Sequence, residues 1–385
     1  MPTVDSQISG QISGQIPGVY LTRIVPTPEP QLLTGVPVFL GFASVRDGVN
    51  EPKKLTLMLQ FEQHFSSIGN GYLADAVRGF FANGGRLCYA IALSDHKLTT
   101  LQTALETSEI LEDVDLVCAP DLMTVPDAEQ QRMQQAILEH CDRMGDRFAI
   151  LDALNVDDVQ AIAQQQQGLS SPNGALYAPW LQVENLSEAS VPKFVPPCGH
   201  IAGTYASSDR QVGVHGAPAN IRLEEVLDLS LSLTPADLEL LNPISGNGVN
   251  CIRSLRGRGI RVWGVRTLSN ISEWQYVNVR RLFLTFRRWA DRNLADTVFE
   301  PNAFPLWIRL QRELSVYCES LWRQGALQGS VPQEAFYVNC DATTNPSELR
   351  ELGQVTAEIG LAPTIPGEFI RLLLVQSSSG INITT

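Results

Sequence analysis

Short runs of almost unbroken apolar residues alternate with amphipathic segments in the first half of this 385-residue chain. The apolar runs lie at residues 36–42, 86–93, 114–120, 147–154 and 174–183. Such runs are typical of strands that are buried on both faces of a parallel sheet. The segments between them, at 73–82, 98–109, 126–144 and 157–167, predict helices. Strands and helices that alternate in this way predict an α/β sheet with helical crossovers.

The second half of the chain follows a proline-rich break at 187–197 and has a different order of elements. We predict a strand at 259–268, two long helices at 273–294 and 305–323, and strands at 334–341 and 368–375. The predicted fold class is therefore α/β with α+β character, in which mixed β-sheets are flanked by helices.

Both ends of the chain are strand-prone and lie outside any core pattern. Near the start, QISGQISGQIPGVYL repeats a four-residue unit that spaces Ile8, Ile12 and Ile16 evenly. The interleaved glycines argue against a helix, because each interior Gly costs about 1 kcal/mol relative to Ala. The last ten residues, QSSSGINITT, place Ile381 and Ile383 in alternation. We expect two extended arms whose apolar side chains have no partner nearby in sequence.

Composition argues against several classes of protein. No apolar run reaches the roughly 18 residues of a membrane-spanning helix, and the start does not resemble a secretory signal, so we expect no direct membrane insertion. The seven cysteines are scattered without the spacing of a zinc site or a disulfide framework. A net charge of −13 argues against nucleic acid as a partner.

Catalytic motifs are weak. The fragments Gly246-x-Gly248 and Gly257-x-Gly259 lack the third glycine of a dinucleotide-binding loop, and no GxxxxGK[ST] sequence occurs. A triad of Cys198 and Asp209 with His200 or His215 would need a nucleophile turn that the sequence lacks. We therefore expect no enzymatic activity, no cofactor and no metal. A nucleotide-binding α/β enzyme remains the alternative from another class.

One segment is basic inside an acidic chain: residues 250–325 hold thirteen arginines and six acidic residues. In the predicted helix at 273–294, Val279, Leu282, Phe283, Phe286, Trp289 and Ala290 form an apolar stripe. Arg280, Arg281, Arg287 and Arg288 fall almost opposite it, and we expect them to have no acidic partner in their own helix. The helix at 305–323 adds Arg309, Arg312 and Arg323. These arginines predict a cationic surface for an anionic partner, the alternative being an ordinary solvated face.

Several long stretches, in the same order, resemble the C-terminal domain of contractile tail sheath proteins. They are GVHGAPAN, LNPISGNGVNCIRSLRGRGIRVWGVRTLS, EWQYVNVRRL, VFEPN, LWRQGALQG and AFYVNCD, and PGVYL near the start is similar to the family's N-terminal signature. The resemblance is dense over residues 195–375 and loose before them. It implies four segments: an N-terminal strand-exchange arm (1–20), an outer α/β domain (21–195), a C-terminal sheath domain (196–375) and a C-terminal arm (376–385).

The resemblance also implies a function. Sheath subunits polymerise as stacked hexameric rings around an inner tube and contract to drive it through a target envelope. Their arms add strands to neighbouring subunits, a role that would fall here to Ile8, Ile12, Ile16, Val19, Tyr20, Ile381 and Ile383. The implied partners are other copies of the chain, the inner tube, the baseplate and a tail-terminator or cap protein. Assembly would occur in the bacterial cytoplasm, and the particle would be a phage tail or a tail-like injection device. A static, non-contractile tube is the nearer alternative.

From this resemblance we expect residues 257–268 and 334–341 to lie in one domain with the sheet that receives the arms. Trp263 would then be a core residue, and its replacement by Ala would cost about 3–5 kcal/mol. We expect the seven named arginines to face the tube.

Overall fold

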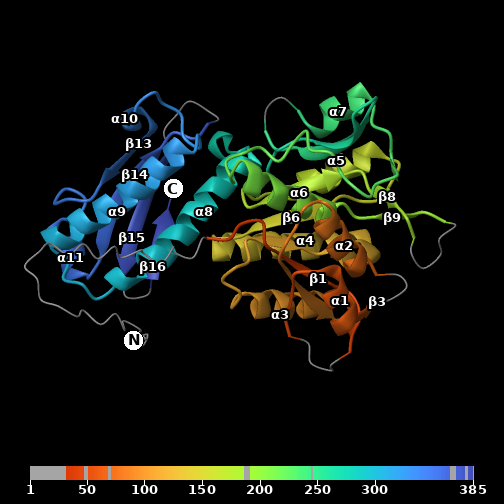
Figure 1. Ribbon diagram of the computed structural model, residues 1–385, viewed down its shortest axis with the longest axis horizontal. Helices are drawn as coiled ribbons and strands as arrows, with labels where there is room; N and C mark the ends of the chain where they lie inside the picture. Colours follow the sequence, from red (N-terminus) through yellow and green to blue (C-terminus); the bar gives the residue numbers. More distant parts are fainter. Residues whose placement is uncertain are drawn as a thin grey trace, which may run out of the picture. The chain divides into compact units, whose positions relative to one another are not determined.

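The computed structural model describes residues 32–46, 51–67, 71–185, 191–243, 246–364, 370–377 and 380–384 (Figure 1). The helices are α1 (Met58–His64), α2 (Leu73–Ala82), α3 (Leu98–Ser108), η1 (Pro120–Thr124), α4 (Asp127–Met144), α5 (Val159–Gln167), α6 (Cys198–Gln211), α7 (Pro235–Leu241), η2 (Ser272–Trp274), α8 (Val277–Asn293), η3 (Ala295–Thr297), α9 (Phe304–Arg323), α10 (Pro332–Ala335) and α11 (Ser347–Glu351). The strands are β1 (Pro37–Val45), β2 (Lys53–Leu55), β3 (Phe65–Ser67), β4 (Cys88–Leu93), β5 (Leu116–Cys118), β6 (Phe148–Asp152), β7 (Gly174–Ala178), β8 (Leu181–Val183), β9 (Lys193–Val195), β10 (Asp228–Leu229), β11 (Val249–Leu255), β12 (Gly259–Trp263), β13 (Phe336–Asn339), β14 (Val355–Leu361), β15 (Ile370–Ser377) and β16 (Gly380–Thr384).

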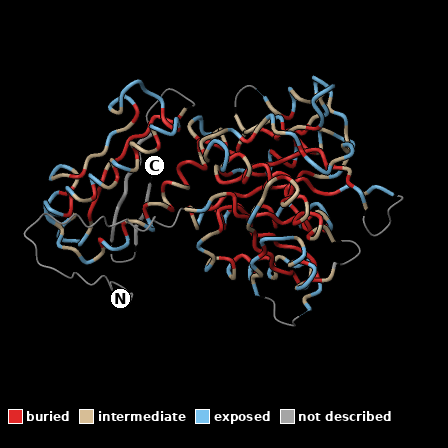
Figure 2. The backbone as a smooth tube through the Cα atoms, viewed as in Figure 1, coloured by how far each residue is buried: buried red, intermediate tan, exposed pale blue. Residues whose placement is uncertain are grey.

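The predicted α/β sheet is present, with strand order β12-β11-β7-β6-β5-β1-β4-β2 and β3 attached to β1. The inner pairs from β4 through β11 are parallel, whereas β2 and β12 join the two ends of the sheet in antiparallel orientation. Strands β4, β6 and β7 are buried along their whole length, which explains their unbroken apolar sequences. Figure 2 shows this buried backbone running through the large sheet.

Helices cover both faces of the large sheet. One face packs on Leu101 of α3, Met133 of α4 and Ile162 of α5. The other face packs on α1, α2 and α6, where Val77 and Ile201 are completely buried. The sheet therefore lies between two helical layers, as the alternation of elements predicted.

Helix α6 lies in a segment for which we predicted no element, and it packs very closely on α2. A Cβ added at Gly199 would lie 2.3 Å from the carbonyl oxygen of Ala76, and one at Gly203 would lie 2.6 Å from that of Phe80. Glycine is required here because the two backbones touch, so the glycines that lower helix propensity are what permit this packing.

The predicted strand at 174–183 is two strands, β7 and β8, that belong to different sheets. Pro179 separates them and has no backbone N–H with which to continue a ladder. Strand β8 instead pairs with β9 and β10 in a small antiparallel sheet.

The C-terminal part forms a second layer, in which α8 and α9 pack with the antiparallel sheet β13-β14-β15-β16. Its core includes Phe286, Leu310, Leu314 and Ile359, all completely buried. Helix α8 also contributes Val277 and Leu284 to the core of the large sheet, so a single helix is shared by both cores.

We expected residues 257–268 and 334–341 in one domain with the sheet that receives the arms, and the structure shows that the two segments contribute strands to two different sheets. Strand β12 closes the large sheet, whereas β13 is an edge of the four-stranded sheet. Strand β12 pairs antiparallel with β11, and β11 pairs in parallel with β7, so the large sheet spans the limit that we placed between 195 and 196. The limits of the four predicted segments stay predictions.

Candidate assembly surfaces

The four-stranded sheet has two open edges among the described residues, β13 on one side and β16 on the other. Strand β16, the predicted C-terminal arm, pairs antiparallel with β15 of its own chain, with Gln376 opposite Ile381 and Leu374 opposite Ile383. An open edge presents unpaired N–H and C=O groups to which another strand can add. The N-terminal arm residues Ile8, Ile12, Ile16, Val19 and Tyr20 lie outside the described residues.

The arginines of α8 do not form the exposed cationic face that we predicted. Arg281 is 2% exposed: it donates two hydrogen bonds to Asp209, at 2.8 and 2.7 Å, and one to Asp115 at 3.0 Å. Its guanidinium also lies 4.8 Å from the ring centroid of Tyr205. Burial alone would lower the pKa of Arg281, but the two carboxylates raise it above its usual value, so the side chain stays charged.

The other arginines of α8 are engaged in similar ways. Arg288 is 6% exposed and donates to the carbonyl oxygen of Leu33 at 2.9 Å, as well as to those of Glu112 and Asp113. Arg280 donates to Asn173 at 2.7 Å, and burial lowers its pKa to about 10. Arg287, a quarter exposed, pairs at 3.7 Å with Asp291, four residues along the same helix, so the expectation that these arginines have no acidic partner in their own helix is wrong. The predicted apolar stripe packs into the core of the C-terminal layer. The opposite face of α8, which carries these arginines, packs against polar groups of the large sheet and its connecting segments.

The arginines of α9 divide into three cases. Arg309 is surrounded by carboxylates: it pairs with Asp296 at 2.7 Å, Glu313 at 2.8 Å and Glu300. Arg323 is exposed and pairs with Glu319 at 2.6 Å. Arg312 is exposed, and no ion pair between described residues involves it. Of the seven predicted arginines, Arg312 thus retains the most freely available positive charge.

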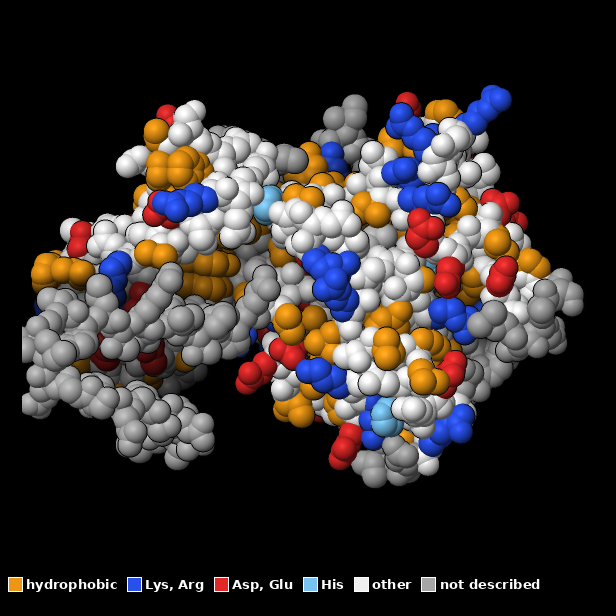
Figure 3. Space-filling model, viewed as in Figure 1, with side chains coloured by type: hydrophobic (Ala, Val, Ile, Leu, Met, Phe, Trp, Pro, Cys, Tyr) orange, Lys and Arg blue, Asp and Glu red, His pale blue; other side chains and the backbone are white. Residues whose placement is uncertain are grey.

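Trp263 is 38% exposed and is not the core residue that we expected. It lies on the end strand β12, and the guanidinium of Arg253 sits 5.7 Å from its ring centroid. Arginines also occupy the tip of the hairpin between β11 and β12, where Arg256 and Arg258 are exposed. Figure 3 shows that Lys and Arg side chains gather unevenly, with a group at the upper right of this face. The predicted strand at 259–268 gave no sign of β11, so the hairpin that holds Arg256 and Arg258 could not be recognised from the sequence.

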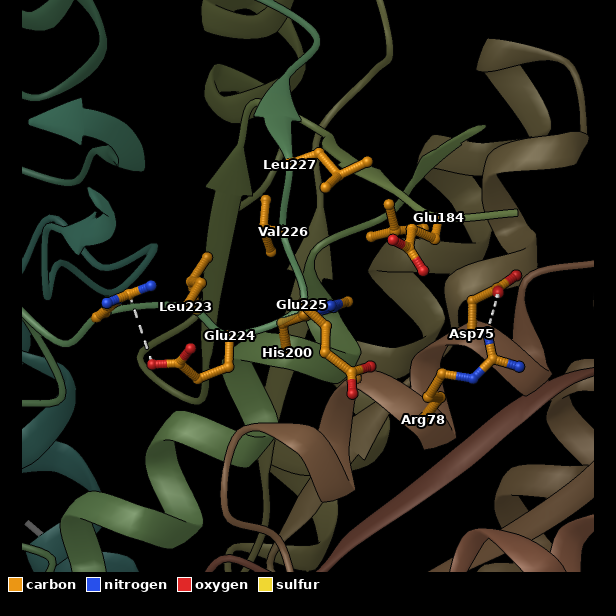
Figure 4. A pocket seen from close by; sticks show the side chains of 12 residues that line it. Asp75, Arg78, Glu184, His200, Leu223, Glu224, Glu225, Val226 and Leu227 are labelled. Atoms are coloured by element: carbon orange, nitrogen blue, oxygen red, sulfur yellow. Dashed lines mark ion pairs between the residues drawn. The ribbon is translucent and has the colours of Figure 1, made fainter. Parts of the chain in front are cut away.

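A cavity of about 510 Å³ opens beside α2 and α6 and is lined by both charged and apolar side chains. Figure 4 shows Glu224 and Glu225 on one side, with Asp75 and Arg78 across from them and paired at 3.6 Å. His200, at the cavity wall, is 3% exposed, and burial lowers its pKa to about 4. The side chain is therefore neutral at pH 7.

The residues considered for a triad are not set up for nucleophilic attack. Cys198 is completely buried, and burial raises the pKa of its thiol well above the usual value, which disfavours the thiolate needed for attack. Asp209 is bound to Arg281. Among the described residues, no group of three His, Cys, Asp or Glu side chains is placed to hold a metal ion, and no described helix could span a membrane.

Comparisons with known proteins agree with one another. A model of the phage tail sheath protein central domain matches residues 100–268. The contracted sheath complex of PVC, an extracellular contractile injection system, contains a chain that is 30% identical; the match covers 95% of this chain and 99% of that one, with a TM-score of 0.72. A chain of the anti-feeding prophage baseplate, solved with six-fold symmetry, is 29% identical over 93% of this chain and 98% of that one, with a TM-score of 0.76.

A putative prophage major tail sheath protein of Pseudomonas aeruginosa, strain UCBPP-PA14, is 26% identical over 247 residues. That match covers 61% of this chain and 60% of the relative's length, so this chain corresponds to less than two thirds of that protein. The mixed α/β fold and the near-complete match to a chain of a solved contractile sheath complex lead to the same conclusion: the chain belongs to the contractile tail sheath family and is a structural subunit, not an enzyme.

Proposed function

We propose that this chain polymerises as stacked hexameric rings around an inner tube and contracts to drive the tube through a target envelope. The match along almost the whole chain to a sheath solved in a contracted state carries the proposal. The six-fold symmetry of the related baseplate particle supports the hexameric ring and a baseplate partner. The inner tube and a terminator or cap protein complete the partners, and the particle assembles in the bacterial cytoplasm.

We further propose that the arms link the subunits. Strand β16 pairs with β15 of its own chain through backbone hydrogen bonds, and the same ladder can form on β15 of a neighbour. Exchange of an identical strand has a low energetic cost, because the backbone hydrogen bonds that break in one subunit form again in the next. The N-terminal arm would add to the other open edge, at β13.

For contact with the tube, Arg312 is the strongest of the seven predicted arginines. Arg281 and Arg288 are buried, and Arg309 is surrounded by three carboxylates. An exposed ion pair contributes roughly 0–1 kcal/mol, so the tube would be held by many weak, salt-sensitive contacts along the lattice.

The test is co-expression of the chain with its tube and baseplate proteins, followed by electron microscopy. We expect extended, tube-filled particles that shorten and widen when a chemical trigger is applied. Deletion of residues 376–385 should give soluble, cooperatively unfolding subunits that do not polymerise. Particles that never change length would support the static tube instead, and truncated subunits that build normal sheaths would contradict the arm proposal.

A further inference from the structure

The hairpin of β11 and β12 carries four arginines and no acidic residue: Arg253, Arg256, Arg258 and Arg261. No ion pair between described residues involves any of these four, although Arg222 beside them pairs with Glu224. The hairpin is held firmly. Arg261 donates to the carbonyl oxygen of Arg258 at 3.0 Å, and Arg253 lies over Trp263. Arg253 and Arg261 are therefore fixed in place, Arg256 and Arg258 are exposed at the tip, and no ion pair between described residues neutralises any of the four.

The hairpin extends beyond the large sheet. Strand β11 pairs in parallel with β7 only through Val249–Cys251 and then continues to Leu255. Its tip therefore lies past the carboxyl edge of the parallel strands. Gly257 at the tip has φ +74°, and nothing lies within 4 Å of a Cβ added there, so this turn is open to an approaching surface.

A group of unneutralised carboxylates lies at the C-terminal ends of α3 and α4, which pack side by side. Glu109, just after α3, is bound by Arg143 of α4 at 2.5 Å, which ties the two helix ends together. Glu106, Glu112 and Glu139 around this contact are exposed, and no ion pair between described residues involves them. We call Glu106, Glu112 and Glu139 the acidic helix ends.

The topology keeps the basic hairpin and the acidic helix ends apart within one subunit. Crossover helices run antiparallel to the strands that they connect, so the C-terminal ends of α3 and α4 lie at the amino edge of the sheet. The hairpin lies at the carboxyl edge, and β11, β7, β6 and β5 separate β12 from β1. At about 4.8 Å between strands, this separation is roughly 24 Å across the sheet alone. The two groups therefore occupy opposite corners of the same sheet.

We propose that the basic hairpin of one subunit docks on the acidic helix ends of a neighbouring copy, an interface that rests on the self-assembly proposed above. Outside residues 250–325 the chain has 35 acidic and 15 basic residues, so a second copy offers the complementary charge. An interface between two different patches is heterologous and continues head to tail, which generates rings or helices. Opposite charges at the two patches also fix their register and speed association.

The test uses the full chain and measures polymer formation by sedimentation and electron microscopy at low salt. Arg256→Glu together with Arg258→Glu should reduce the polymer fraction at least tenfold, while the melting temperature of the subunit stays within about 2 °C. The matched control is Arg86→Glu with Arg292→Glu, which makes the same change in net charge at exposed arginines outside the hairpin and should polymerise normally.

A charge swap then identifies the partner patch. Adding Glu106→Arg and Glu139→Arg to the hairpin variant should restore polymers. The proposal is overturned if the hairpin variant polymerises like the original chain, if the swapped chain is no better than the hairpin variant, or if the hairpin variant loses only tube or nucleic-acid binding. A native chain that remains monomeric would overturn the proposed function as well, so the two failures are distinguishable.

Discussion

Replacement of Arg281 by Met is the sharpest test of whether the basic face of α8 stabilises the fold. Both carboxylate oxygens of Asp209 bind Arg281, and Asp209 would lose both hydrogen bonds. Asp115 would keep two of its hydrogen bonds, because it also accepts from the backbone N–H groups of Gly35 and Val36. Removing one partner of a buried pair costs about 3–5 kcal/mol, since it leaves a charge without compensation. We expect a loss of that size in the free energy of unfolding.

The assay is urea unfolding of soluble subunits, with Arg292→Met as the control, since Arg292 is exposed on the same helix and should change stability by less than about 0.5 kcal/mol. A second variant, Arg281→Met with Asp209→Asn, should recover part of the loss because the stranded charge is gone. If Arg281→Met is no more destabilising than the control, the buried cluster does not hold the fold together.

The loss in Arg281→Met should also depend on pH. Burial already raises the pKa of Asp209, and removal of the arginine raises it further. The folded variant then keeps a proton that the unfolded chain releases above about pH 4, so its stability falls as pH rises and recovers as pH is lowered. A deficit that is constant between pH 4 and pH 8 would contradict this reasoning.

Three further predictions use the same unfolding assay. Gly203→Leu should cost at least about 1–3 kcal/mol by forcing α6 away from α2, whereas Gln211→Ala at the exposed end of α6 should be nearly neutral. Trp263→Ala should cost well below the about 3–5 kcal/mol of a core tryptophan, and Trp180→Ala, at 3% exposure, should reach that range. Burial raises the pKa of Asp152 to about 7, so its contribution to stability should fall by up to about 4 kcal/mol as pH rises from 4 to 7, and Asp152→Asn should remove this dependence. Equal losses for the two tryptophans, a harmless Gly203→Leu, or an unchanged pH profile in Asp152→Asn would each refute the corresponding argument.

The large sheet could be predicted from sequence because its strands are buried on both faces. Burial on both faces requires apolar residues at consecutive positions, and the sequence shows this as the unbroken apolar runs of β4 and β6. Helix α6 has no comparable pattern in the sequence, because Gly199 and Gly203 argue against a helix. Their role in close packing can be recognised only once α2 is known to lie against them. Local propensity was outweighed here by a tertiary contact.

The candidate arginines show a second limit of sequence reasoning. Helical periodicity placed Arg281 and Arg288 correctly on the face opposite the apolar stripe of α8. It could not show what covers that face, because Asp209 and Asp115 are 72 and 166 residues away in the chain. The same limit applies to Trp263, whose exposure depends on the position of β12 at the end of the sheet.

The shared helix α8 constrains how the proposed contraction would work. Its apolar residues enter both cores, and Arg281 and Arg288 bind carboxylates and carbonyls of the large domain. Separating the large sheet and its helices from the C-terminal layer would expose both hydrophobic cores to water and leave buried charges without partners. Each of these effects would cost several kcal/mol. Contacts between subunits that are made and broken during contraction must be weaker than this. We therefore infer that each subunit moves as a rigid body, with the change of shape located in the links between subunits.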